Sequence, residues 1–140
     1  MGFLKSLFHP SNGRDDGESP RFVSETAFRK NLTKQSEMCP QTVAQLRNYG
    51  VTDATRLKLE FFFYTDAEAK AIALCDSLDG LDYQTERPAS VDDSRLFLVT
   101  GWTNPVQMDD SSVLVWTQSM CQLGYEHDCD FDGWGTNPEQ

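Results

Sequence analysis

Residues 55–64 read Thr-Arg-Leu-Lys-Leu-Glu-Phe-Phe-Phe-Tyr, the clearest strand pattern in the chain. Apolar and charged side chains alternate in its first half, which is typical of a strand with one buried face. We expect the buried face to carry Leu57, Leu59, Phe61 and Phe63. The opposite face would carry Phe62 together with Arg56, Lys58, Glu60 and Tyr64.

A helix is predicted directly after this strand. Thr65 and Glu68 have the spacing of a capping box, in which two side chains satisfy free N–H groups at the start of a helix. Gly80 is a natural stop for this helix. The helix is expected to bury one apolar stripe, formed by Ala71, Leu74, Cys75 and Leu78.

Two more strands and a second helix are expected to follow. Residues 81–87 predict a short strand of weak pattern. Residues 95–102 predict a strong strand, and their almost continuous apolar run favours a central position in the sheet. The next helix would begin after Asp109 or Asp110 and end at Gly124. Its buried stripe would comprise Val113, Trp116, Thr117 and Met120.

The last predicted strand covers residues 125–132, and its strict alternation would place four carboxylates on one face: Glu126, Asp128, Asp130 and Asp132. Like charges in such a row repel each other, so something should offset them. One interpretation is pairing with Arg56 and Lys58 on the first strand, combined with protection of the sheet edge against aggregation. The other is an acidic platform for a basic partner. Both remain open, because two cations cannot neutralise four carboxylates.

The resulting order, β-α-β-β-α-β, predicts an α+β fold: a ferredoxin-like split βαβ sandwich with an antiparallel sheet. One or two N-terminal helices would precede it. The first would be capped by Ser24, and a second would begin at Pro40 and stop at Gly50. Both crossover helices must cover the same face of the sheet. We expect the N-terminal helices to cover the other face, which would otherwise be open to a partner.

A length of 140 residues fits one domain. Residues 9–20 have the composition of turns and linkers, so residues 1–22 are expected to form a disordered tail. Residues 23–140 would form the single domain, with its core over residues 51–136. The sequence shows neither an apolar run long enough for a membrane helix nor a secretion signal. We therefore expect a cytoplasmic protein with reduced cysteines and no membrane partner.

The formal net charge of −10 is unevenly distributed. Residues 1–58 carry nine Lys/Arg and six Asp/Glu, a net of +3, whereas residues 59–140 carry three Lys/Arg and sixteen Asp/Glu, a net of −13. A region this acidic repels the phosphates of nucleic acids, so direct nucleic-acid binding is not expected. It either attracts a basic protein surface or only keeps the protein in solution.

The sequence assigns no catalytic residue, no metal site and no cofactor, and an enzyme is not expected. One motif comes close to a calcium loop, because its spacing fits: Asp128, Asp130, Asp132, Gly133 and Glu139. A strand pattern leads into this motif, however, where a calcium loop requires a helix. His127 and Cys129 would share one strand face, too far apart for tight proton transfer.

The segment Asp132-Gly133-Trp134-Gly135-Thr136 follows a helix, a Gly-Tyr pair and an acidic strand. This arrangement resembles the C-terminal signature of the regulator of ribonuclease activity B family, and the resemblance extends over residues 38–136. It implies a ferredoxin-like fold with helical additions and a non-catalytic inhibitor that binds the endoribonuclease RNase E. An alternative function is that of an immunity or antitoxin-type protein that neutralises a basic partner.

The expected partner is a basic protein surface, such as that of RNase E. It would contact the acidic face and the segment that follows: Glu126, Asp128, Asp130, Asp132, Gly133, Trp134, Gly135 and Phe62. The two glycines let the backbone turn tightly around the indole of Trp134. That indole either caps the core at the end of the sheet or anchors a partner, because tryptophan is enriched in interface hot spots.

Overall fold

The computed structural model describes residues 21–91 and 95–140. The predicted tail, residues 1–22, lies outside this part of the chain except for Arg21 and Phe22, and Phe22 is buried. Within the described ranges the chain forms, in order, α2 (Glu25–Arg47), β1 (Arg56–Leu57), β2 (Leu59–Thr65), α3 (Glu68–Asp79), β3 (Gln84–Thr85), β4 (Ala89–Val91), β5 (Leu96–Trp102), β6 (Val106–Gln107), α4 (Asp110–Glu126) and β7 (Asp130–Thr136).

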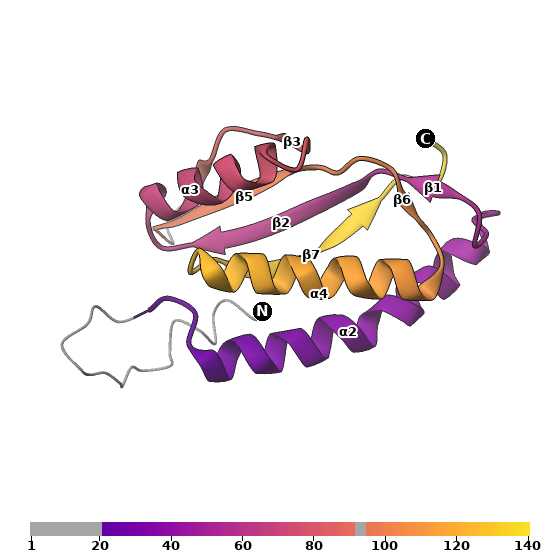
Figure 1. Cartoon of the computed structure of the whole chain (residues 1–140), viewed down its shortest axis with the longest axis horizontal. Coiled ribbons are helices and arrows are strands. Elements are labelled where there is room, and N and C mark those ends of the chain that lie inside the picture. The colour runs from indigo at the N-terminus through magenta and orange to yellow at the C-terminus, as the bar shows by residue number, and fades with distance from the viewer. Residues whose placement is uncertain (1–20, 92–94) are drawn as a thin grey trace.

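The main sheet has five strands, all paired antiparallel, in the order β3-β5-β2-β7 (Figure 1). Strands β3 and β4 both pair with β5, on successive parts of its length. The long strand β2 therefore lies between β5 and the last strand β7, which is the order of a split βαβ sandwich. This confirms the predicted α+β, ferredoxin-like architecture, including the central position of β5. The short second sheet of β1 and β6 was not predicted.

Strand β2 alternates as its sequence predicts. Leu59, Phe61 and Phe63 are fully buried, whereas Glu60 and Phe62 are only partly buried. The predicted capping box at the end of this strand is wrong. Thr65 is still part of β2, and its hydroxyl donates to the backbone oxygen of Asp128 at 3.0 Å. The N-cap position of α3 is Ala67, whose side chain makes no hydrogen bond to the helix.

Helices α3 and α4 cover the same face of the sheet, as predicted. Their buried stripes join one core cluster with the inward side chains of β2. The predicted stripe of α3 is buried throughout, as is that of α4. Asp109 caps α4, because its carboxylate accepts from the backbone N–H of Ser112 at 3.0 Å. This side of the sheet holds the hydrophobic core.

The N-terminal part of the domain is one helix, α2, and not two helices separated at Pro40. Ser24 caps it as predicted, since its hydroxyl accepts from the backbone N–H of Ala27 at 3.0 Å. An internal proline removes one hydrogen bond and strains the turn before it. Here Cys39 and Val43, on either side of Pro40, are both buried, so one packed stripe continues through the proline.

Helix α2 runs beside α4 and reaches the edge strand β7 (Figure 1). Because α2 packs against α4, it does not lie across the face of the main sheet that points away from α3 and α4. We call this the second sheet face. At one end of that face Phe22 and Val23 pack against Leu96. The expectation that N-terminal helices cover this face is therefore met only at this end, by Phe22 and Val23 and by Ala27 and Phe28 in the first turn of α2. No helix in the described ranges is long and apolar enough to cross a membrane.

Candidate protein-binding surface

Residues 125–132 do not form one strand, and only residues 130–132 belong to β7. Helix α4 continues through Gly124 to Glu126, His127 caps it, and β7 begins only at Asp130. Gly124 serves close packing and does not end the helix: a Cβ atom there would lie 2.8 Å from the backbone oxygen of Cys129 and 2.9 Å from the ring of Phe63. The predicted row of four carboxylates on one strand face is therefore wrong.

Asp128 lies in the turn after α4, with a positive φ of 58°. Its carboxylate accepts from the backbone N–H groups of Phe22 at 2.8 Å and Val23 at 2.7 Å. Lys70 Nζ lies 2.7 Å from the same carboxylate, and Arg21 lies 3.5 Å from it. Asp128 thus joins the start of the domain to α3 and to the turn before β7, and its charge is already neutralised within the chain.

Asp130 is paired with Tyr64 across the β2–β7 ladder and is 4% exposed. Burial, and then the nearby charge of Asp132, raise the pKa of Asp130 to about 7. The predicted pairing of this region with Arg56 and Lys58 is wrong. The residue of β7 opposite Leu59, next to Lys58, is Thr136, at the far end of the strand.

Asp132 occupies the irregularity in the ladder between Phe62 and Phe63, and it is partly exposed. Burial raises the pKa of Asp132, and the positive charge of Lys34 on α2 opposes that shift. Of the four carboxylates in the predicted row, Asp132 and Glu126 are therefore the two that reach solvent without a salt bridge in the described part of the chain.

The indole of Trp134 packs on the core. Its ring meets that of Trp116 edge to face, with centroids 6.1 Å apart and planes at 85°. Trp134 is one of the partly buried side chains at the border of the main core cluster. Gly133 has a φ of 124°, which favours glycine, and lies opposite Phe62 in the ladder. Phe62 is partly buried on the second sheet face, away from Trp134.

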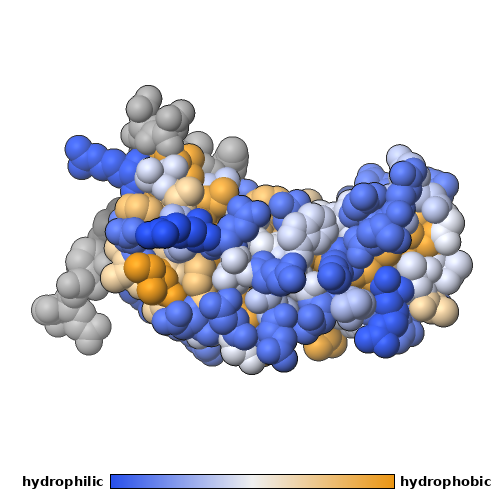
Figure 2. Space-filling view, turned by 90° about the horizontal axis from the view of Figure 1, so that it is seen from above, coloured by the Kyte–Doolittle hydropathy of each residue, from blue (hydrophilic) through white to orange (hydrophobic). Residues whose placement is uncertain are grey.

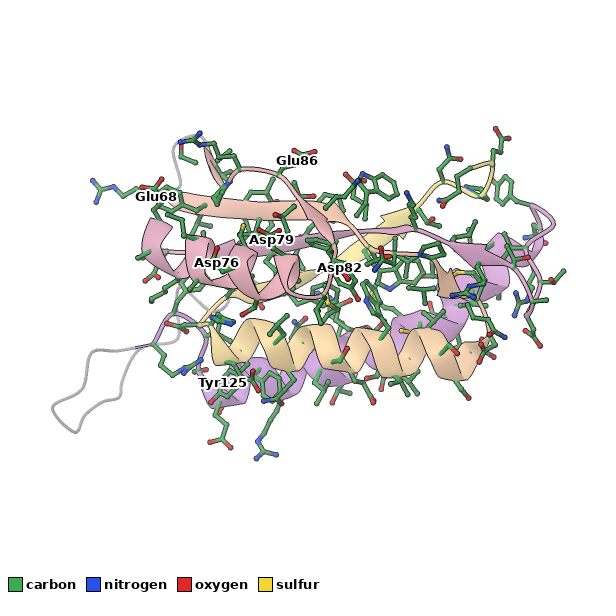
Figure 3. All side chains as sticks on the ribbon, turned by 45° about the horizontal axis from the view of Figure 1, so that its top comes forward. Glu68, Asp76, Asp79, Asp82, Glu86 and Tyr125 are labelled. Carbon is green, nitrogen blue, oxygen red and sulfur yellow. The ribbon has the colours of Figure 1, made fainter. Side chains whose placement is uncertain are left out.

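Five exposed acidic residues lie instead on and after α3: Glu68, Asp76, Asp79, Asp82 and Glu86 (Figure 3). We call this set the α3 acidic surface. None of its members takes part in a salt bridge within the described ranges. The face of the molecule seen from above, which carries α3, is mainly hydrophilic with separate apolar patches (Figure 2). Such a surface can attract a basic partner, because its carboxylates are not paired with cations of the described part of the chain.

A comparison with protein-family profiles matches residues 37–136 to the family described as RraB, regulator of ribonuclease activity B. The chain belongs to this family. The matched range includes the end of α2 and every later element to β7. The members of the RraB family are regulators of ribonuclease activity, and the match confirms the resemblance read from the sequence. No curated protein matches the chain.

The RraB domain offers little for covalent or metal chemistry in its described part. The four cysteines are free and buried, and burial raises the pKa of the Cys121 and Cys129 thiols to about 12. Thiols held this far from ionisation are poor nucleophiles. His127 hydrogen-bonds the hydroxyl of Ser77 at 2.9 Å. In residues 21–91 and 95–140, no three His, Cys, Asp or Glu side chains converge as metal ligands.

The sequence prediction missed the α3 acidic surface, although a signal for it was present. Between Lys70 and Arg87 the chain has four carboxylates and no basic residue. Glu68, Asp76 and Asp79 also lie outside the apolar stripe of the predicted helix, Asp76 opposite it and the other two beside it.

Proposed function

We propose that this protein regulates a ribonuclease by binding it, without a catalytic step of its own, and that the ribonuclease is RNase E. The observation that carries the proposal is the family match over residues 37–136. It favours a ribonuclease regulator over the alternative of an immunity or antitoxin-type protein. The interaction would take place in the cytoplasm, where RNase E would act on RNA.

The distribution of charge supports a basic partner surface. The α3 acidic surface is exposed and has no salt bridge among the described residues, so a basic surface could pair with it without breaking one. Electrostatic attraction of this kind speeds association and weakens as salt rises, because the screening length falls to about 8 Å at physiological ionic strength.

The residues expected from sequence to bind the partner divide into three groups in this proposal. Asp128 and Asp130 serve the fold, since one is neutralised internally and the other is buried. Glu126 is exposed at the end of α4 and joins the α3 acidic surface as a contact. An alternative contact surface lies on the second sheet face and along β7, with Phe62, Asp132, Gly133, Trp134 and Gly135.

The test is binding of the full-length chain to purified RNase E by biolayer interferometry at low and high salt, with cleavage of a fluorescent RNA measured in parallel. The wild-type chain should bind, slow cleavage, and bind more weakly at high salt. Asp76→Lys/Glu86→Lys should reduce the association rate by at least tenfold at low salt. The control Glu37→Lys/Glu139→Lys makes the same charge change at exposed sites on α2 and after β7, and should have a smaller effect.

Absence of binding by the wild-type chain at low salt would refute the assignment of RNase E as the partner. Binding with equal loss in both double variants would mean that net charge alone steers association. In that case the second sheet face would become the leading candidate for the specific contact.

A further inference from the structure

A shallow groove of about 370 Å³ lies between the end of α3 and the C-terminal half of α4. Its walls are formed by Leu81, Tyr83, Ser119, Met120, Gln122, Leu123 and Glu126. One member of the α3 acidic surface, Asp82, follows directly after the groove residue Leu81 in the chain. Figure 3 shows Asp76, Asp79 and Asp82 following one another along α3 and past its end.

The groove combines an apolar interior with an exposed apolar rim. Leu81 is 49% exposed and forms the apolar rim. Tyr83 and Leu123 are partly buried at the border of the core, and Met120 lies beneath them. The ring of Tyr83 is held in place, because its hydroxyl accepts from the indole N–H of Trp116 at 3.1 Å. Methionine adapts its shape to an inserted side chain.

The charge at the groove is negative, because Glu126 is the charged residue among those that line it. The chain has no Lys or Arg in residues 71–86 or in residues 96–140, so neither wall has a cation of its own. Neither α3 nor α4 has a basic residue in its last turn. The carbonyl groups at a helix C-terminus carry partial negative charge and favour a nearby cation, so the two helix ends add to the carboxylates around the groove.

We propose that this groove binds a Lys/Arg-rich segment of the partner that inserts one large apolar side chain between Leu81 and Leu123. The proposal rests on the proposed function and assigns the site through which it acts. The charge decides the occupant: nucleic acids and anionic lipid surfaces are repelled, and a second copy of this acidic chain is disfavoured for the same reason. Basic side chains flanking the inserted residue would pair with Glu126, which lines the groove, and with Asp82, next to Leu81 in the chain.

Two synthetic peptides test the groove without RNase E. Both have 13 residues rich in lysine and alanine and the same charge; one has a central leucine and the other has alanine in its place. Titrated into the ¹⁵N-labelled full chain, they should shift the amide signals of Leu81, Tyr83, Leu123 and Glu126. The leucine peptide should bind at least about fivefold more tightly than its twin, as burial of a leucine side chain implies.

The variant Leu81→Ala should remove this preference for leucine, and the matched control Val115→Ala should retain it. Val115 lies on α4, is 66% exposed and does not line the groove. Equal affinity for the two peptides, signal changes centred elsewhere, or no binding of either peptide would overturn the proposal.

Binding of RNase E to the same variants separates this inference from the proposed function. If RNase E binds wild-type and Leu81→Ala chains equally, the ribonuclease partner stands and the groove assignment fails. If the peptides bind as expected while RNase E does not bind, the groove stands and the partner is another protein with a basic, apolar segment.

Discussion

The carboxylate of Asp128 accepts a hydrogen bond from the backbone N–H of Val23 at 2.7 Å, which joins two residues 105 positions apart in the chain. The same side chain binds the N–H of Phe22 and pairs with Lys70. One residue of the turn after α4 therefore fixes where α2 begins. Because Phe22 and Val23 also pack on Leu96, this contact aligns the start of the domain with the second sheet face.

Asp128→Asn should lower the free energy of unfolding by about 1–3 kcal/mol, because a charged hydrogen-bond acceptor and a salt bridge are both weakened. Asparagine tolerates the positive φ at this position, so the backbone is not strained. Urea denaturation followed by circular dichroism measures the change. Asp53→Asn, which breaks the exposed Arg47–Asp53 pair, is the control and should change stability by less than about 1 kcal/mol. Equal effects of the two substitutions would show that Asp128 does not hold the start of the domain.

Gly124→Ala should destabilise the protein although alanine is the better helix former. The added methyl group would meet the Cys129 carbonyl oxygen and the Phe63 ring at distances below 3 Å. Overpacking of this kind costs about 1–3 kcal/mol and should outweigh the gain in helix propensity of about 1 kcal/mol. The melting temperature should fall. Gly135→Ala, where a Cβ atom meets nothing within 4 Å, is the control; a rise in melting temperature for Gly124→Ala would refute the close packing.

The sequence predicted the architecture correctly for helices and strands that bury one face along their whole length and expose the other. Leu59, Phe61 and Phe63 all face the core, so the alternation in the sequence and the alternation in space coincide. The stripes of α3 and α4 were predicted for the same reason, since each helix buries one face against the sheet.

The errors arose where contacts distant in sequence decide the local structure. Gly124 looks like a helix stop, but its role depends on the ring of Phe63, 61 positions earlier. The alternating charges of residues 125–132 look like a strand, yet they divide into a helix end, a turn and the first residues of β7. Pro40 looks like a helix start because the sequence does not show the packing of α2 against α4.

Asp130 should make stability depend on pH. Its pKa of about 7 in the folded protein lies above the ordinary value of 3.8, so the folded state binds the proton more tightly than the unfolded state. This group's contribution is therefore greatest at low pH and is lost as pH rises from about 4 to about 7. Asp130→Asn should be more stable than wild type at pH 8 by roughly 1–4 kcal/mol, and this advantage should shrink at pH 5. Urea denaturation of both proteins at the two pH values measures the difference. An advantage that is the same at both would show that Asp130 titrates normally.

Trp134 should matter more for stability than for partner binding. Its indole packs edge to face on Trp116 at the border of the core, and removal of a large partly buried ring leaves both a cavity and an exposed Trp116. Trp134→Ala should lower the free energy of unfolding by about 2–4 kcal/mol, and Trp134→Phe by less. Tyr49→Ala removes an aromatic ring that is 68% exposed and should change stability by less than about 0.5 kcal/mol. Affinity for RNase E, measured well below the melting temperature, should be unchanged within twofold in Trp134→Phe. A large loss of affinity with normal stability would instead make Trp134 the anchor of the partner and would move the binding surface from α3 to β7.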